Sequence, residues 1–374
     1  MKKTSAIIML AAMAAVLPAC KQAQESAEAM KPALVKLEKA VTDGKYMYVM
    51  QDALCYGQGW HIEAGALASD PVDKCDIKSV CGDYPAIVGF DLGGIEKADT
   101  CNLDGVDYAF MRRAAIEHAR RGGLVTFSWH LRNPLTGGDA WDVSSDKVVA
   151  SVLPEGECHE MFMQWLCRLA DFLDTMRDDD GTLIPIIFRP WHENTGSWFW
   201  WGARLCTVDQ YRQLWQMTYD YLVKERGLDS MAWAYSPSST ALKECGLERY
   251  PGDEIIDIIG VDRYAAGKQT EISENFISGM HGDLEYLGEF AKEHEILLAV
   301  TETGQESQTC PGWWTKELMP ALEGLPVCYV LTWRNAWDAE HPGHWFSAFP
   351  GAPNEADFVE FYKSDKTLFL NDIR

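Results

Sequence analysis

Short apolar runs alternate along the chain with longer stretches in which apolar residues recur every three or four positions. Short runs are typical of buried strands, and the longer spacing, as in Leu214, Met217 and Tyr221, is typical of amphipathic helices. The predicted strands are 46–50, 86–91, 124–129, 183–189, 231–235, 255–262, 296–301 and 327–333. The predicted helices are 107–121, 157–176, 208–226, 274–294, 313–323 and 356–362.

Eight strands that alternate with helices predict an α/β fold, a single (β/α)8 TIM barrel. The alternative is an open, doubly wound sheet, but no GxGxxG motif follows the first strand and the sequence contains no P-loop. No internal repeat or low-complexity segment divides the chain, so we assign residues 41–374 to one barrel domain. Its two longest connections, 51–85 and 130–156, are expected to build the rim.

The first twenty residues have the pattern of a targeting segment. Two lysines precede an apolar stretch, 6–17, that is too short to span a bilayer and suits a signal-peptide core. It ends in Leu-Pro-Ala-Cys, which resembles a bacterial lipoprotein processing box. We therefore expect a lipoprotein signal peptide over 1–20 with the lipid on Cys20; ordinary signal cleavage nearby is the alternative. Residues 21–40 are expected to form a tether that runs into a short helix.

Lipidation would place the protein in the bacterial cell envelope, anchored to the outer membrane and facing the periplasm or the cell surface. The anchor would be its only membrane contact. The formal net charge of −23 leaves no basic excess to neutralise phosphates, which argues against nucleic acid as a partner. Neutral substrates fit better, and 15 tryptophans favour exposed aromatic platforms. We expect a monomer.

The cysteines allow disulfides but no zinc site. An oxidising envelope compartment permits bridges, which we expect among Cys55, Cys75, Cys81 and Cys101, with the connectivity left open. Cys328 lies in an apolar strand and is expected to be a buried thiol. The chain has no CxxC pair, and the two histidines of the His-Pro-Gly-His segment at 341–344 are expected to lie in a rim loop or turn, so no metal is expected.

Polar or aromatic groups end almost every predicted strand. They are Asp91, Trp129-His130, Arg189, Tyr235-Ser236, Asp262-Arg263-Tyr264, Glu302 and Trp333-Arg334. One such group would be an ordinary exit to solvent. Because the carboxyl ends of barrel strands converge on one face, where active sites of this fold lie, the whole set predicts a single pocket.

Two carboxylates stand out in that pocket. Glu193 follows the fourth predicted strand and Glu302 follows the seventh. Alone, the first would be a solvated loop acid and the second a strand-end cap. Together, with tryptophans beside them, they are the pair needed to cleave a glycosidic bond, because one carboxyl protonates the leaving oxygen and the other attacks or assists at the anomeric carbon.

The segment RPWHENTGSWFWWG, residues 189–202, is similar to the signature of glycoside hydrolase family 26, mostly β-mannanases among the clan A barrels. The resemblance extends to Trp-His-x-x-Asn-Pro at 129–134, Asp-x-Tyr at 262–264, Thr-Glu-Thr-Gly at 301–304 and Trp-Arg-Asn-Ala at 333–336. It covers roughly residues 45–365. Most of the clan has Asn before the acid, and His192 at that position is a feature of this family.

The resemblance implies that Glu193 is the general acid/base and Glu302 the nucleophile of a retaining double displacement without a cofactor. Arg189 either keeps Glu302 ionised, forms a structural salt bridge, or does both. The other expected substrate-site residues are His130 as a pocket wall, His192, Asp262 and Tyr264 as positioning groups, Trp198 and Trp333 as sugar platforms, and Arg334 as a contact to a more distal sugar. The neighbouring Trp200 and Trp201 are expected to include packing residues.

Two classes of function follow. The first is an endo-β-1,4-mannanase acting on mannan, galactomannan or glucomannan; a lichenase-type endo-glucanase or a β-1,3-xylanase of the same family is the alternative within it. The second is a glycan-binding lipoprotein built on an inactive barrel. Retention of both carboxylates argues against the second class, since a pure binder has no use for the pair.

Overall fold

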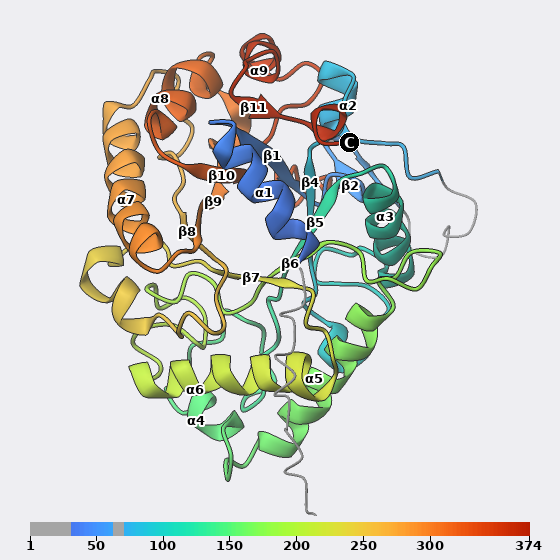
Figure 1. Ribbon diagram of the computed structural model, residues 1–374, viewed down its shortest axis with the longest axis vertical. Helices are drawn as coiled ribbons and strands as arrows, with labels where there is room; N and C mark the ends of the chain where they lie inside the picture. Colours follow the sequence, from blue (N-terminus) through green and yellow to red (C-terminus); the bar gives the residue numbers. More distant parts are fainter. Residues whose placement is uncertain (1–30, 63–70) are drawn as a thin grey trace, which may run out of the picture. The chain divides into compact units, whose positions relative to one another are not determined.

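The computed structural model describes residues 31–62 and 71–374, so the predicted signal peptide and Cys20 lie outside the described residues. Eight parallel strands close into a barrel (Figure 1). They are β1 (Tyr46–Gln51), β4 (Ile87–Asp91), β5 (Leu124–Ser128), β6 (Ile186–Arg189), β7 (Ala232–Tyr235), β8 (Ile258–Asp262), β9 (Leu297–Thr303) and β10 (Val327–Thr332). Each strand pairs with the next, and β1 pairs with β10 to close the ring. All eight predicted strands, and the TIM barrel, are confirmed.

Helices surround the barrel in the predicted places. They are α3 (Tyr108–Arg120), α5 (His159–Asp174), α6 (Val208–Tyr219), α7 (Glu274–Glu293), α8 (Met319–Leu322) and α9 (Glu355–Tyr362). Capping side chains define the starts of three of them: Asp107 caps α3, Thr207 forms a capping box with Gln210 at α6, and Ser273 caps α7. π-helical turns continue α6 over Asp220–Glu225 and precede α8 over Trp313–Leu318, which completes the predicted helical lengths.

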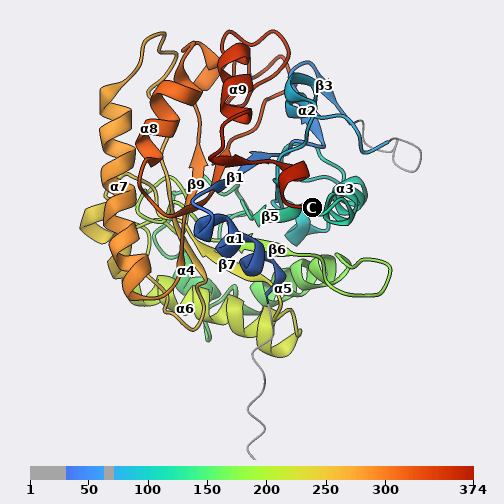
Figure 2. The ribbon, with the colours of Figure 1, turned by 45° about the horizontal axis from the view of Figure 1, so that its top comes forward.

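Several short elements were not predicted. They are β2 (Tyr56–Gly57), β3 (Trp60–His61), α2 (Asp76–Cys81), α4 (Val148–Val152) and β11 (Thr367–Leu368), which pairs with β1 outside the ring. Four of them lie in the connections expected to build the rim. Figure 2 shows α2 and β3 at one edge of the molecule, and α2 contacts α9 there. No element of this length shows a periodicity that can be recognised.

The helix α1 (Pro32–Thr42) corrects the predicted domain boundary. Its Ala33, Leu37 and Ala40 are buried together with the side chains that fill the barrel, among them Val49 and Leu331. The helix lies across the barrel (Figure 1), and Lys31, just before it, pairs with Asp257 at 2.8 Å. Residues 31–40 therefore belong to the folded domain, and the tether can include only residues before them.

The expected disulfides are not found. All ten cysteines of the described residues are free thiols, including Cys55, Cys75, Cys81 and Cys101. Cys75 caps α2 and Cys81 ends it, about 9 Å apart along the helix axis, which is beyond the reach of a disulfide. Cys328 is a buried thiol, as predicted. Among the described helices, none is long and apolar enough to cross a membrane.

Candidate active site

The carboxyl ends of β6, β8 and β9 bring three charged side chains together. Arg189 ends β6, and its Nη1 donates to Oδ2 of Asp262 at the end of β8 (3.1 Å). Its Nη2 pairs with Oε1 of Glu302, which lies within β9 and not after it. All three side chains are buried, so the arginine offsets charges that water does not screen. Arg189 therefore forms the salt bridge that was one of its two predicted roles. It also lies beside Glu302, as expected.

A strained turn after β6 carries Glu193 into the same pocket. Trp191 and Glu193 both have positive φ, 55° and 52°, which is uncommon for residues of this size. The surrounding structure holds the turn: Glu193 N donates to the Ser236 carbonyl (2.6 Å), and Tyr211 Oη donates to the Trp191 carbonyl (2.7 Å). Trp201 Nε1 donates to the His192 carbonyl (2.8 Å). These three hydrogen bonds hold the turn of the tryptophan-rich segment directly after β6.

The two glutamates face each other at short range. Carboxylate oxygens of Glu193, Asp262 and Glu302 all lie within 4.8 Å of one another. Burial, together with the charge of Glu302, raises the pKa of Glu193 well above its usual value. Trp198 Nε1 donates to Oε2 of Glu193 (2.5 Å), which favours the ionised form but does not reverse the shift. Burial and the charge of Glu302 therefore favour the protonated form of Glu193.

Glu302 has a different environment. Arg189 lies against one carboxylate oxygen, and Tyr264 Oη donates to the other at 2.7 Å. Burial and the neighbouring carboxylates raise the pKa of Tyr264 well above its usual value, so this hydroxyl remains a donor. Asp262 has a pKa raised to about 7, because burial and Glu302 outweigh the pull of Arg189. The three acidic side chains could hold a cation, but Arg189 already pairs with two of them.

An aromatic wall flanks the carboxylates. The His130 ring meets His192 edge-on, with Nε2 to Nε2 at 3.0 Å, and packs against Trp333 with centroids 6.1 Å apart. Trp198 and Trp333 are both partly exposed, as a surface for sugar rings requires. Asp91 at the end of β4 bonds to the His130 ring and is a site residue that the motifs missed. The sequence feature that points to Asp91 is its position at the end of a predicted strand.

Arg334 lies at the edge of this wall. Its Nη1 pairs with Asp104 at 3.3 Å, and its guanidinium lies 5.8 Å from the centroid of the Tyr56 ring. Tyr56 Oη donates to Asp52 (3.0 Å), which is fully buried. The structure thus brings all ten predicted site residues of the barrel to one end. It adds Asp52 and Tyr56 from the connection 51–85 and Asp104 from the connection between β4 and α3, and neither connection has a recognisable pattern.

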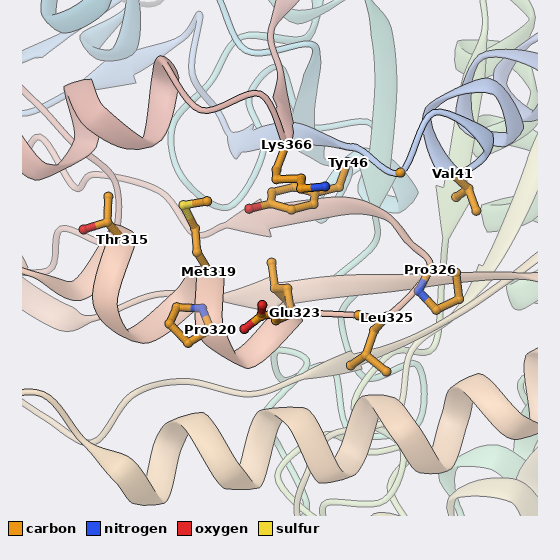
Figure 3. A pocket seen from close by; sticks show the side chains of 12 residues that line it. Val41, Tyr46, Thr315, Met319, Pro320, Glu323, Leu325, Pro326 and Lys366 are labelled. Atoms are coloured by element: carbon orange, nitrogen blue, oxygen red, sulfur yellow. The ribbon is translucent and has the colours of Figure 1, made fainter.

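Four further side chains that the sequence analysis named lie outside the carboxylate cluster itself. Trp200 and Trp201 are fully buried packing residues, as predicted, and His341 and His344 pair separately with Asp338 and Glu306. A cavity of about 750 Å³ lies near the start of β1 and is lined by side chains such as Tyr46, Met319 and Lys366 (Figure 3). It contains none of the acidic groups described above, so the chemistry belongs to the other end of the strands.

The chain matches known proteins over this same region. The model of glycosyl hydrolase family 26 matches residues 38–287, which include the turn with Glu193. The chain belongs to glycosyl hydrolase family 26. A mannan endo-1,4-beta-mannosidase of Bifidobacterium adolescentis is 32% identical over 320 residues, 81% of this chain and 32% of that protein. A Bacillus subtilis protein of the same name is 31% identical over 198 residues, 50% of this chain and 53% of that protein.

Solved structures agree with this family 26 barrel. The GH26 β-mannanase BoMan26A of Bacteroides ovatus is 42% identical with a TM-score of 0.82, covering 91% of this chain and 95% of that one. A Cellulomonas fimi endo-β-1,4-mannanase is 31% identical with a TM-score of 0.78, covering 93% and 77%. The chain spans only about a third to a half of the length of the two curated relatives.

Proposed function

We propose that this family 26 barrel is a retaining endo-β-1,4-mannanase. The observation that carries the proposal is the separation of the two glutamates, whose nearest oxygens lie within 4.8 Å. Retaining glycosidases hold their carboxyls roughly 5–5.5 Å apart, and inverting ones leave roughly 6.5–9.5 Å for a water molecule. The family and the names of the curated relatives support mannan as the substrate class.

The proposed reaction has two steps. In the first, Glu302 attacks the anomeric carbon while Glu193 gives its proton to the leaving glycosidic oxygen, so the C–O bond breaks as the ester to Glu302 forms. In the second, Glu193, now ionised, takes a proton from water, which attacks the same carbon and releases Glu302. Two inversions give net retention of configuration.

The electrostatics support these roles. The raised pKa of Glu193 keeps the acid protonated before the first step. After Glu302 becomes a neutral ester, one of the charges that raise the pKa of Glu193 is gone, which favours Glu193 as a base in the second step. Arg189 and Tyr264 stabilise Glu302 as an anion and hold its two oxygens in place.

The surroundings fit a neutral polysaccharide. Trp198 and Trp333 offer partly exposed apolar faces for sugar rings, and we propose that Arg334 contacts a sugar outside the cleavage position. We further propose that the protein is a monomer, lipid-anchored through Cys20 to the outer membrane. The Leu-Pro-Ala-Cys sequence after a short apolar core supports the anchor.

A polymer panel tests the proposed substrate. Linear mannan, galactomannan, glucomannan, lichenan and β-1,3-xylan are digested at equal mass, and the products are resolved by chromatography. We expect the highest rate on a β-1,4-mannan, with internal cleavage shown by a rapid fall in viscosity. A higher rate on lichenan or on β-1,3-xylan would replace the substrate and leave the two-glutamate mechanism standing. No cleavage of any polymer by the wild type, with binding retained, would identify a glycan-binding protein.

A further inference from the structure

Both carboxylate oxygens of Asp91, beside the candidate active site, accept hydrogen bonds. It ends β4 and is buried, with 1% exposed. Its oxygens accept from Ser128 Oγ, Gly93 N and His130 Nδ1, each at 2.7 Å, and from His130 N at 3.3 Å. Among these donors only the His130 ring can carry a charge. A buried carboxylate needs such a partner, because leaving one uncompensated is strongly destabilising.

The contact between the two histidines requires one proton between them. His130 Nε2 and His192 Nε2 lie 3.0 Å apart, so one is a donor and the other an acceptor. Asp91 can only accept, which fixes a proton on Nδ1 of His130. His192 Nδ1 is buried without a hydrogen-bond partner among the described residues. The position of the shared proton therefore depends on whether His130 or His192 is the more basic ring.

The charged groups around the rings decide this. Those facing His130 are Asp91 from β4, Arg189 and His192 from β6 and its turn, Glu302 from β9, and Asp104 from the connection after β4. Burial lowers the pKa of His130, but Asp91 and Glu302 outweigh it and raise that pKa above its usual value. Burial, Arg189 and His130 lower the pKa of His192 well below its usual value. His130 is thus the more basic ring.

We propose that Asp91 is a positioning residue of this site, an inference that rests on the proposed function. It holds His130 with a proton on both nitrogens, so that His130 Nε2–H donates to His192 and the His192 proton stays on Nδ1. The pair then has a single orientation beside Glu193.

The fixed His130 ring supports the sugar-facing wall. Trp141 stacks on it at 5.2 Å and 11°, Phe199 meets it edge-on at 5.2 Å, and Trp333 lies at 6.1 Å. A cationic imidazole is attracted to aromatic faces at such distances. Its positive charge also attracts the carboxylate of Glu302, the proposed nucleophile. Asp91 thereby acts on the wall and on Glu302 through His130, without touching substrate itself.

The test is Asp91→Asn, examined by NMR of protein carrying ¹⁵N-histidine. The variant keeps an acceptor for His130 Nδ1–H but removes the charge. We expect the pKa of His130 to fall by about 1–3 units. The His192 proton should move from Nδ1 to Nε2, and kcat/KM on mannan should fall about 10–100-fold. Ser128→Ala is the matched control: it removes a neutral hydrogen bond to the same carboxylate and should leave both tautomers unchanged.

Two results would overturn the proposal. One is an Asp91→Asn protein whose His130 pKa and His192 tautomer match the wild type. The other, which needs no variant to fold, is a wild-type spectrum at pH 6 in which His130 Nε2 carries no proton. The NMR measurement does not depend on activity. A wild type that cleaves no mannan would therefore refute the proposed function without deciding the role of Asp91.

Discussion

The roles that we propose for Glu193 and Glu302 differ because the surroundings of the two carboxyl groups differ. Glu302 has a guanidinium on one oxygen and a phenol on the other, whereas Glu193 has a single indole donor and two nearby carboxylates. This difference supports the proposed role of Glu193 as proton donor and that of Glu302 as nucleophile. At this scale the contacts of Glu193 can be changed one at a time.

Trp198→Phe should shift the pH dependence upward. The variant keeps an aromatic ring for the sugar but loses the N–H that donates to Glu193, and that bond lowers the pKa of the acid. Without it the pKa of Glu193 rises further, so the protonated form persists to higher pH. The alkaline limb of kcat/KM, measured on mannan oligosaccharides, whose leaving sugar needs a proton, should move to higher pH. Trp333→Phe is the control, and a downward or absent shift in Trp198→Phe would count against Glu193 as the acid.

At the scale of elements, the sequence predicts what periodicity and strand ends can encode. The eight strands and six helices follow from apolar spacing, and polar strand ends converge because parallel strands share a direction. Asp52, Tyr56 and Asp104 could not be found this way, because Tyr56 lies in a two-residue strand and Asp52 and Asp104 lie in turns. The disulfide prediction failed because a cysteine count and a compartment do not give a geometry. The sequence predicts the short helix before residue 41, but its place in the barrel domain depends on contacts with strand side chains that are distant in the chain.

The helix α3 predicts a pH dependence of stability. His118 is fully buried, with Nε2 3.3 Å from the Ala86 carbonyl, and burial lowers its pKa to about 4. The unfolded chain binds this proton near pH 6.5, so stability is full above that pH and is lost as pH falls toward 4. Between pH 7 and 4.5 the loss should be roughly 2–3 kcal/mol, since one pKa unit is about 1.36 kcal/mol.

Urea unfolding of His118→Asn at both pH values measures this contribution. The variant should lose less stability than the wild type between pH 7 and 4.5, whatever its stability at pH 7. The exposed His341→Asn should retain the wild-type difference. Equal losses in wild type and His118→Asn would show that His118 is not the group responsible.

At the scale of the whole molecule, the two ends of the barrel carry different features. The candidate active site lies at the carboxyl ends of the strands. The described chain begins at Lys31, which pairs with Asp257 just before β8, at the opposite end. A barrel anchored through its N-terminus would therefore leave the site accessible to polymer. The net charge of −23 is compatible with a neutral substrate.

Replacing Cys20 tests the proposed anchor. Cys20→Ala should move the protein from the membrane pellet to the supernatant without changing its activity on mannan, because the barrel is unaltered. Cys101→Ala, a partly exposed cysteine of the barrel, should stay with the membrane. A Cys20→Ala protein that still pellets after detergent-free washing would exclude lipid at this position.

The most direct test of the account compares Glu193→Ala and Glu302→Ala on a dinitrophenyl mannobioside, whose leaving group needs no proton. We predict that Glu193→Ala gives a burst of dinitrophenol and a slow steady state, which azide accelerates with formation of a β-mannobiosyl azide, because Glu302 still forms the mannobiosyl ester. Glu302→Ala should give neither, and both should lose on the order of 10³-fold in rate on polymer. A burst and a β-azide product from Glu302→Ala would show that the two roles are exchanged. Substantial polymer cleavage by both variants would show that neither glutamate is catalytic.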